Sequence, residues 1–317
     1  MGIPRQALLL RLAIATTALA AIGLALAYVV AWIPVWPWAL LEHFRVQYVA
    51  LGVIATAAAA VLRVRGYLDV AAIATLLHAL PVTADLCRTP QLELADGVAL
   101  HVLVLNVHTE SSSFDQVRQL IADEHPDIVG LLEVDQRWIV GVAPALAGYT
   151  GRIEAPRGDN FGIALYARGH LAGSAEELGS SLPSVVAELS IREAQLRVIL
   201  VHPPPPMSAG NLAEQYDEVA AIARRVAARE PTIIMGDFNA TPWSKPFVEL
   251  VARSGLCDSR AGFGIQPSFP TASALLRIPI DHLLVSCAVG VRDRRIGRDV
   301  GSDHLPVILD LAIPRSR

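Results

Sequence analysis

Charged side chains are scarce in the first quarter of this chain, and this restricts the fold more than any other feature of the sequence. Residues 1–86 carry eight charged side chains and contain three long apolar runs, roughly Leu12–Ile33, Val46–Leu62 and Tyr67–Leu86. Each run is close to the roughly 17–25 residues that a helix needs to cross the apolar core of a bilayer. The sequence therefore predicts a membrane domain, residues 1–89, with three transmembrane helices.

Two other interpretations of these runs are open. A cleaved signal peptide would account for the first run, which has a basic start and small residues. Buried helices of a soluble protein would account for all three runs. The two later runs speak against a signal peptide, and alanine-rich runs with so few charges are uncommon in soluble folds. Tryptophans and prolines between residues 32 and 38 are typical of a turn at the membrane–water interface.

The arginines near the membrane indicate an orientation. Four lie on the side of the N-terminus and two on the opposite side: Arg5, Arg11, Arg63 and Arg65 against Arg45 and Arg88. Positive charge favours the cytoplasmic side, so the N-terminus is expected inside and the large C-terminal part outside. Three cysteines are too few for a disulfide framework, and a single bridge between Cys257 and Cys287 outside the cytoplasm is left open.

Residues 90–317 have the size of one domain. They carry 20 basic and 27 acidic residues, a formal charge of −7, and Lys245 is their only lysine. A dedicated nucleic-acid binder would carry a basic tract for the phosphate backbone, which this domain lacks. A nuclease stays open, because bound metal ions can supply the positive charge.

Strands outnumber helices in this second domain. Runs rich in valine, leucine and isoleucine predict strands, and amphipathic stretches predict helices between them. The expected strands are 98–107, 127–132, 162–166, 184–191, 196–202, 232–236, 281–286 and 306–311, and the expected helices are 114–124, 136–146, 209–229 and 245–253. This order favours two packed sheets covered by helices over a simple alternating parallel sheet.

Polar side chains gather where these strands begin or end. The clusters are Asn106, Glu133, His202, Asp237 with Asn239, Asp281 with His282, and Asp303 with His304. Taken singly they have simpler explanations: Asn106 as a turn cap, His202 as a packing residue, and His282 as a strand-facing histidine, which is the interpretation that we keep for it. Six clusters at the strand ends of a sheet sandwich predict a pocket with chemistry at its mouth.

The stretch from Thr232 to Pro242 is central to this prediction. A short apolar run reads as a buried strand, and Gly236 allows a sharp turn at its end. Asp237 and Asn239 lie two residues apart on extended backbone, so their side chains leave the same face. A carboxylate and an amide in this arrangement suit a site that binds a metal-bound oxyanion and aims a water at it.

The order of the motifs is similar to one family. The matching segments are Leu105-Asn106-Val107, Leu132-Glu133-Val134, His202 before prolines, Gly236-Asp237-Phe238-Asn239, Ile280-Asp281-His282 and Gly301-Ser302-Asp303-His304-Leu305-Pro306. Together they resemble the endonuclease/exonuclease/phosphatase superfamily over about residues 100–312. The resemblance implies an α/β fold, a four-layer sandwich of two mixed β-sheets flanked by helices.

The resemblance also implies hydrolysis of phosphate esters with Mg²⁺, or alternatively Mn²⁺, as cofactor. Carried over to this sequence, Glu133 is the main metal ligand, and Asn106 and Asp303 complete the metal environment. Hard oxygen ligands and few protein contacts are what Mg²⁺ prefers, which leaves positions for water and phosphate.

The remaining matched residues take catalytic roles by the same resemblance. Asp237 would orient or deprotonate the attacking water, and Asn239 would hold that water and a phosphoryl oxygen. His304, with its ring fixed by Asp281, would bind the scissile phosphate or act as its acid or base. His202 would be a second histidine that faces the phosphate.

Further segments indicate a subtype. Asp159–Tyr166 and His202–Pro206, joined to three spans, look like membrane-anchored bacterial members with a VanJ-like architecture, which act on a lipid-linked pyrophosphate. The leading hypothesis is a hydrolase of a lipid-linked phosphate or pyrophosphate in the bacterial cytoplasmic (inner) membrane, with its catalytic domain, residues 90–317, outside the cytoplasm. The alternatives are a tethered extracytoplasmic nuclease that acts on nucleic acid and a membrane scaffold with a decayed site. The complete set of site residues speaks against the scaffold.

The arginine distribution predicts the location of the C-terminus. A reporter enzyme that is active only outside the cytoplasm, fused after Arg317, should give signal, because three spans and an inside N-terminus place the C-terminus outside. The same reporter inserted beside Arg63 should be silent. Signal at Arg317 from a cytoplasm-dependent reporter alone would reverse the orientation and remove the argument for an exported lipid substrate.

Overall fold

The computed structural model describes residues 5–89, 96–226 and 231–315, and the chain divides into two compact units, Met1–Asp85 and Leu86–Arg317. The first unit consists of three long helices, α1 (Arg5–Val30), α2 (Arg45–Val61) and α3 (Arg65–Leu86), with a 3₁₀ helix η1 (Trp38–Phe44) before α2. Three segments are long and apolar enough to cross a membrane: α1, the combined η1 and α2 (Trp38–Val61), and α3; at most 22 % of the most apolar window of each is buried. Helices of a soluble core would bury far more of such windows.

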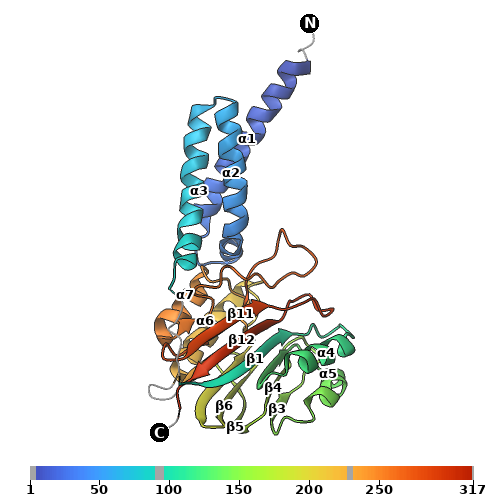
Figure 1. The fold of residues 1–317 in the computed structure, drawn as a ribbon. Helices are drawn as coiled ribbons and strands as arrows, with labels where there is room; N and C mark the ends of the chain where they lie inside the picture. The colour runs from blue at the N-terminus through green and yellow to red at the C-terminus, as the bar shows by residue number, and fades with distance from the viewer. Residues whose placement is uncertain (1–4, 90–95, 227–230, 316–317) are drawn as a thin grey trace. The chain divides into compact units, whose positions relative to one another are not determined.

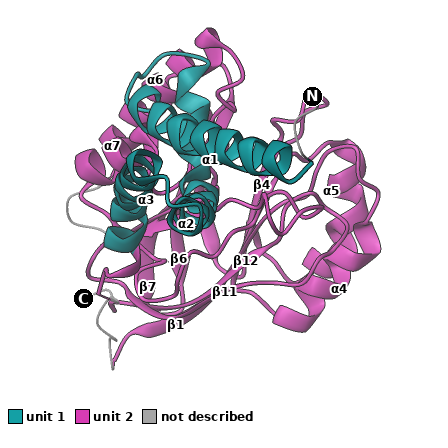
Figure 2. Ribbon diagram, turned by 90° about the horizontal axis from the view of Figure 1, so that it is seen from above, with its two compact units in different colours: residues 1–85 teal, residues 86–317 magenta. Residues whose placement is uncertain are grey.

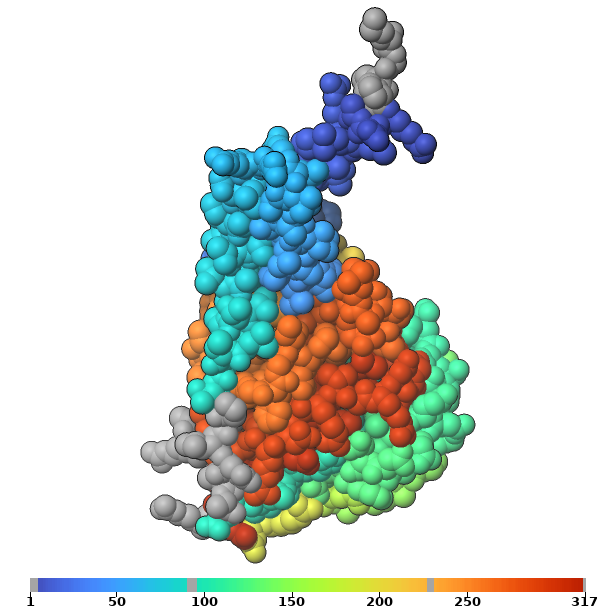
Figure 3. Space-filling model, turned by 45° about the horizontal axis from the view of Figure 1, so that its top comes forward, coloured from blue at the N-terminus to red at the C-terminus, as the bar shows by residue number. Residues whose placement is uncertain are grey.

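Small side chains let the three helices of the first unit approach one another. Ala21 and Leu24 of α1 pack with Ala55 of α2 and with Ala71 and Ala74 of α3. Such small contact residues are typical of helices that associate within a bilayer. α2 and α3 lie side by side, whereas α1 crosses them obliquely and its N-terminal part projects away (Figures 1, 2 and 3).

The second unit contains two six-stranded sheets. The first has the order β11–β12–β1–β2–β4–β3 and the second the order β5–β6–β7–β8–β10–β9. β1 and β2 are parallel, as are β7 and β8, and the other neighbours are antiparallel, so both sheets are mixed. The strands are β1 (Val98–Asn106), β2 (Ile128–Leu132), β3 (Gly151–Ala155), β4 (Ile163–Ala167), β5 (His170–Glu177), β6 (Pro183–Ile191), β7 (Ala194–Val201), β8 (Thr232–Asp237), β9 (Cys257–Asp258), β10 (Asp281–Val285), β11 (Gly290–Ile296) and β12 (Val307–Ile313).

Helices cover the outer face of each sheet. α4 (Phe114–Glu124), α5 (Gln136–Val142) and the 3₁₀ helix η2 (Ala143–Leu146) pack on the first sheet, and α6 (Ala209–Arg225) and α7 (Lys245–Ser254) pack on the second. The two pairs of α-helices lie on opposite sides of the sheets (Figure 2). The expected four-layer sandwich of two mixed β-sheets flanked by helices is confirmed.

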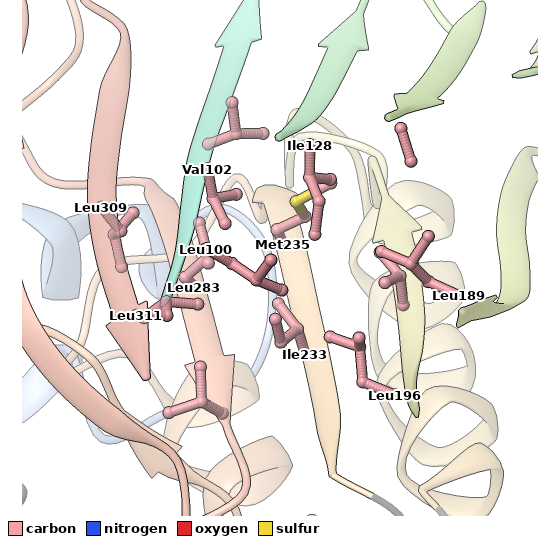
Figure 4. Packing of buried hydrophobic residues seen from close by; sticks show 14 of the residues in the cluster. Leu100, Val102, Ile128, Leu189, Leu196, Ile233, Met235, Leu283, Leu309 and Leu311 are labelled. Atoms are coloured by element: carbon pink, nitrogen blue, oxygen red, sulfur yellow. The ribbon is translucent and has the colours of Figure 1, made fainter. Parts of the chain in front are cut away.

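Apolar side chains fill the space between the two sheets. Figure 4 shows Leu100, Val102 and Leu309 from the first sheet pointing toward Ile233 and Leu283 from the second. Alternate residues of β1 instead face α4 and α5, because successive side chains of a strand leave opposite faces. Burial on both faces explains why the central strands read as continuous apolar runs.

Four strands escaped the sequence-based expectations. β3 and β9 are short edge strands, β5 is an edge strand with a mostly exposed pattern, and β11 carries three arginines and an aspartate. Edge strands bury one face weakly and carry charges, so they lack the apolar pattern by which a strand is recognised. The helix expected over 209–229 ends at Arg225, and residues 227–230 lie outside the described part.

Candidate active site

Two parallel strand pairs bring the predicted site residues to one edge of the sandwich. β1 and β2 run parallel in one sheet and β7 and β8 in the other, and the antiparallel neighbours β10 and β12 begin where these strands end. The side chains at these ends are Asn106, Glu133, His202, Asp237, Asp281 and His304. Contacts between them join the two sheets, since the Asn106 amide of β1 donates to Asp237 of β8 at 3.2 Å.

Asp237 lies at the centre of the cluster and is 1 % exposed. Its Oδ1 accepts from the backbone N–H of Asn239 at 2.9 Å. Its Oδ2 faces Nδ2 of Asn106 at 3.2 Å, Nε2 of His202 at 3.5 Å and Nε2 of His304 at 3.6 Å. A buried carboxylate needs such compensation to stay ionised.

Gly236 explains how the backbone delivers this carboxylate. Its φ is +152°, and a Cβ at this position would lie 1.9 Å from the carbonyl oxygen of Val201 on β7. A side chain here would push the strands apart, so β7 and β8 can approach this closely only at a glycine. The close approach brings Asp237 within reach of His202.

His304 is held between two carboxylates. Its Nδ1 lies 2.8 Å from Oδ2 of Asp281, and its ring packs on Phe269 with centroids 4.6 Å apart. The hydroxyl of Ser302 accepts from the His304 backbone N–H at 3.1 Å and donates to the carbonyl of Asn106 at 2.6 Å. These contacts fix the imidazole with one nitrogen toward each aspartate.

The carboxylates favour a protonated imidazole. Burial alone would lower the pKa of His304, but Asp281 and Asp237 outweigh burial and raise it to about 10. Burial would raise the pKa of Asp237, but His304 and His202 hold it at about 2. Burial raises the pKa of Asp281 and the imidazolium opposes that rise. We place the shared proton on His304, because its ring faces two anions.

His202 occupies the other side of Asp237. It is 3 % exposed, and its ring lies 5.2 Å from that of Phe161 between centroids. Burial opposes protonation, but contact with Asp237 outweighs it and raises the pKa of His202. Asp237 therefore favours the protonated form of both histidines.

Glu133 directly follows β2 and has a positive φ of 59°. Its Oε1 accepts from the Asn106 amide at 2.8 Å and its Oε2 from the backbone N–H of Thr109 at 3.2 Å. The Thr109 hydroxyl donates to the Glu133 carbonyl at 2.8 Å. Both ends of the residue are thereby fixed, while its side chain stays partly open to solvent.

Asp303 is partly exposed, with 40 % of its side chain accessible. Its Oδ1 lies 3.8 Å from Nδ1 of His108, whose backbone N–H donates to the Asn106 amide oxygen at 3.0 Å. Asp303 thus reaches Asn106 through His108. The structure brings the three predicted metal ligands into one neighbourhood.

A cation could be held by two groups of side chains in this edge. Asp237, Asp281 and His304 have ligand atoms within 4.8 Å of one another. A metal there would require a neutral imidazole with a free lone pair, whereas His304 faces two carboxylates with both nitrogens. The acid–base interpretation of this group is physically the more consistent one.

The group of Glu133, Asn106 and Asp303 offers oxygen donors alone, which suits Mg²⁺ or Mn²⁺. The Asn106 amide, as oriented, donates to both Glu133 and Asp237. Its oxygen accepts from the His108 backbone N–H at 3.0 Å and has a second lone pair with which it could ligate a metal. The donor set therefore fits the expected metal.

Asn239 is tied to the loop that follows His202. Its φ is +48°, and its Nδ2 donates to the carbonyl of Pro203 at 3.0 Å. His282 lies outside the cluster: it is fully buried against Phe247, with ring centroids 4.3 Å apart, and its Nε2 lies 2.8 Å from the carbonyl of Ala240. Its position agrees with a packing role.

Several residues of the site were not expected from the sequence. His108, Thr109, Phe269 and Ser302 contact predicted residues but lie in loops of irregular structure. Ser302 is within a matched motif, and His108 follows Asn106 by two positions, so proximity in sequence was an available signal for these two. Phe269 had none, because its contact with His304 spans a loop of irregular conformation.

The imidazole between two carboxylates predicts an unusual titration. The ring nitrogens of His304, followed by ¹H–¹⁵N NMR and assigned with His304→Gln, should titrate near pH 10. Asp281→Asn should lower that pKa, because the cation loses an anionic partner. Because the folded pKa is raised, the associated stability is complete below about pH 6.5 and is lost as the pH rises through the folded value.

The control for this titration is Asp310→Asn, which removes the carboxylate 2.5 Å from Nδ1 of His101. This variant should leave the titration of His304 unchanged. A pKa of His304 near 6.5 in the unsubstituted protein would contradict the ion-pair assignment.

The fold is similar to solved structures of low sequence identity. An endonuclease/exonuclease/phosphatase from Beutenbergia cavernae superimposes with a TM-score of 0.56 at 20 % identity, over 68 % of this chain and 72 % of that chain. A humanized D. rerio TDP2 gives 0.56 at 15 % identity, over 67 % and 98 %. The human Nocturnin catalytic domain with bound sulfate gives 0.54 at 18 %, over 68 % and 95 %.

The sequence itself identifies the family. No curated protein matches the sequence. The model of the endonuclease/exonuclease/phosphatase family matches residues 103–304, a span that contains every predicted site residue from Asn106 to His304. The chain therefore belongs to the endonuclease/exonuclease/phosphatase family.

Proposed function

We propose that this protein is a metal-dependent hydrolase of a lipid-linked phosphate or pyrophosphate, anchored in a membrane with its site outside the cytoplasm. The observation that carries the chemistry is the buried Asp237 with an imidazole on either side. Two cationic rings around a fixed carboxylate can bind phosphoryl oxygens and position a water together. Family membership supports hydrolysis of phosphoester bonds in general.

Asp237 is the group that orients the attacking water and accepts its hydrogen bond, with Asn239 beside it. His304, protonated and held by Asp281, donates a hydrogen bond to a phosphoryl oxygen or a proton to the leaving oxygen. His202 supplies a second donor to the phosphate. Each role relies on groups held in place before the substrate arrives, which is how electrostatic stabilisation accelerates phosphoryl transfer.

Glu133, Asn106 and Asp303 are the residues that would hold a divalent metal. Such an ion supplies positive charge to the phosphoryl oxygens and helps to ionise a bound water. The four carboxylates of the site, with Asp303 included, outnumber its three histidines, His108, His202 and His304, so binding an anionic substrate calls for an additional cation.

Two observations support a location outside the cytoplasm. Arginines near the apolar helices are more frequent on the side of the N-terminus. Cys257 and Cys287 form a disulfide with Cα atoms 5.2 Å apart, which joins β9 to the end of β10. Disulfides persist mainly in oxidising compartments.

Exposed apolar side chains on the loops of the site support a lipid-linked substrate. Met207, in the loop that follows His202, is 64 % exposed. Leu275 and Leu276 are 79 % and 52 % exposed, in the loop that precedes Asp281. Large exposed apolar groups on loops connected to site residues favour a ligand with an apolar part, and the acidic domain disfavours DNA.

Removal of the proposed metal ligand gives a first test. Glu133→Gln should lower Mg²⁺-stimulated hydrolysis by at least about 100-fold and abolish its dependence on added metal. The melting temperature should stay close to that of the unsubstituted protein, because a partly exposed carboxylate contributes little packing. The matched control is Glu110→Gln, an exposed carboxylate on the neighbouring loop. Metal-stimulated turnover by Glu133→Gln near the control rate would place the metal elsewhere.

A substrate panel tests the proposed class. Purified full-length protein with Mg²⁺ should hydrolyse long-chain lipid pyrophosphates or phosphates faster than sphingomyelin, sugar phosphates, or single- and double-stranded DNA. Replacing Leu275 and Leu276 together by serine should lower kcat/KM for the long-chain substrate at least about tenfold, since burial of even one leucine side chain contributes about 1.5–3 kcal/mol and about 1.4 kcal/mol is a factor of ten. The same variant should hydrolyse a short-chain analogue at the normal rate.

Val140→Ser is the control for lost apolar surface, since Val140 is 65 % exposed on α5. It should leave both substrates unaffected. Turnover of DNA alone would favour the nuclease alternative, and equal losses on long-chain and short-chain substrates would show that the leucines do not contact the apolar part.

A further inference from the structure

Four consecutive prolines follow His202, and their backbone is held in an unusual way. Proline has a fixed φ and no N–H, so residues 203–206 cannot donate backbone hydrogen bonds. The carbonyls of the first three prolines each accept from a side-chain amide: Pro203 from Asn239 at 3.0 Å, Pro204 from Gln215 at 3.3 Å and Pro205 from Asn211 at 3.1 Å. The segment is thus fixed by amides from elsewhere in the chain.

Gln215 is the member of this set that reaches two loops at once. It lies on α6, is 1 % exposed, and its Nε2 also faces the carbonyls of Phe238 and Asn239, both at 3.2 Å. Two amide hydrogens are shared among three carbonyls, two of them in the loop that follows Asp237. One side chain therefore connects the loop after His202 to the loop after Asp237.

The helix that carries Gln215 is itself anchored on the same face. Asn211, Gln215 and Glu218 recur at helical spacing, four and three residues apart. Glu218 is fully buried and accepts from the hydroxyls of Ser180 at 2.9 Å and Ser184 at 3.3 Å. These bonds hold α6 to β6 and the segment before it, so Gln215 projects from a rigid support.

We propose that Gln215 is a positioning residue that holds His202 and Asp237 at their working separation by bonding to the loops that follow them. The inference rests on the proposed function only for its effect on turnover. His202 Nε2 and Asp237 Oδ2 lie 3.5 Å apart without a strong direct hydrogen bond, so the distance depends on the backbone that supports each residue. A misplacement of about 1 Å at a reacting centre can cost roughly 100-fold in rate.

The charge around His202 gives a readout that needs no substrate. Asp237 and Glu133 favour the protonated ring, and burial and His304 oppose it. Glu218 is a further acid near this ring, and burial raises its pKa to about 7. If the loops separate, contact with Asp237 weakens and the pKa of His202 falls. The contact between His304 and Asp281 lies on the other side of Asp237 and should persist.

The test compares Gln215→Leu and Gln215→Glu in the full-length protein. Gln215→Leu removes the amide, and we expect kcat to fall about 10- to 100-fold with KM changed less than threefold. ¹⁵N NMR of the histidine rings should show a lower pKa for His202. Gln215→Glu should recover activity as the pH falls, because the introduced carboxyl donates a hydrogen bond only when protonated.

The matched control is Gln119→Leu, an exposed glutamine on α4, which should leave kcat and the His202 titration unchanged. If Gln215→Leu does not fold, the acid-side recovery and the His202 titration of Gln215→Glu decide the matter. An unchanged pKa of His202 in a folded Gln215 variant would overturn the proposal. That titration is measured without substrate, so it decides on Gln215 even if every phosphate compound proves inert.

Discussion

The buried carboxylate of Asp237 is the constraint on which the rest of the catalytic unit depends. An ionised group that is 1 % exposed would be costly without partners, and here an amide, a backbone N–H and two imidazoles surround it. Those partners come from four different strand ends. The surrounding structure must therefore hold each strand end to within a fraction of an ångström, and the sheets, crossover helices and loop contacts do so.

The two sheets position these strand ends by the same arrangement of strands. Each sheet contains one parallel pair, joined by a crossover that includes α4 in one case and α6 in the other. A parallel pair directs two carboxyl ends toward the same edge, and antiparallel neighbours begin there. Packing two such sheets face to face brings both edges together across an apolar core. The polar cluster therefore lies at the ends of the strands, outside the interior that apolar side chains fill.

The two units of the chain have surfaces suited to different environments. The first unit forms its backbone hydrogen bonds within helices and exposes apolar side chains, as a bilayer requires. The second is acidic, carries a disulfide and has exposed leucines in the loop that precedes Asp281. A substrate with a phosphate and an apolar chain would use both properties, which is why we favour a lipid-linked compound over a nucleic acid.

The sequence by itself determined the three apolar spans and most central strands, because bilayer length and burial on both faces produce long runs of apolar residues. It also predicted the residues that gather at one edge of the sandwich. It did not reveal the edge strands β5 and β11, whose exposed faces tolerate charge. Only the tertiary structure decided that Asn106 bridges Glu133 and Asp237, that Phe269 packs on His304, and that Gln215 joins two loops. These contacts depend on strand register and sheet packing, which bring together residues as much as 131 positions apart and leave no periodic signal in the chain.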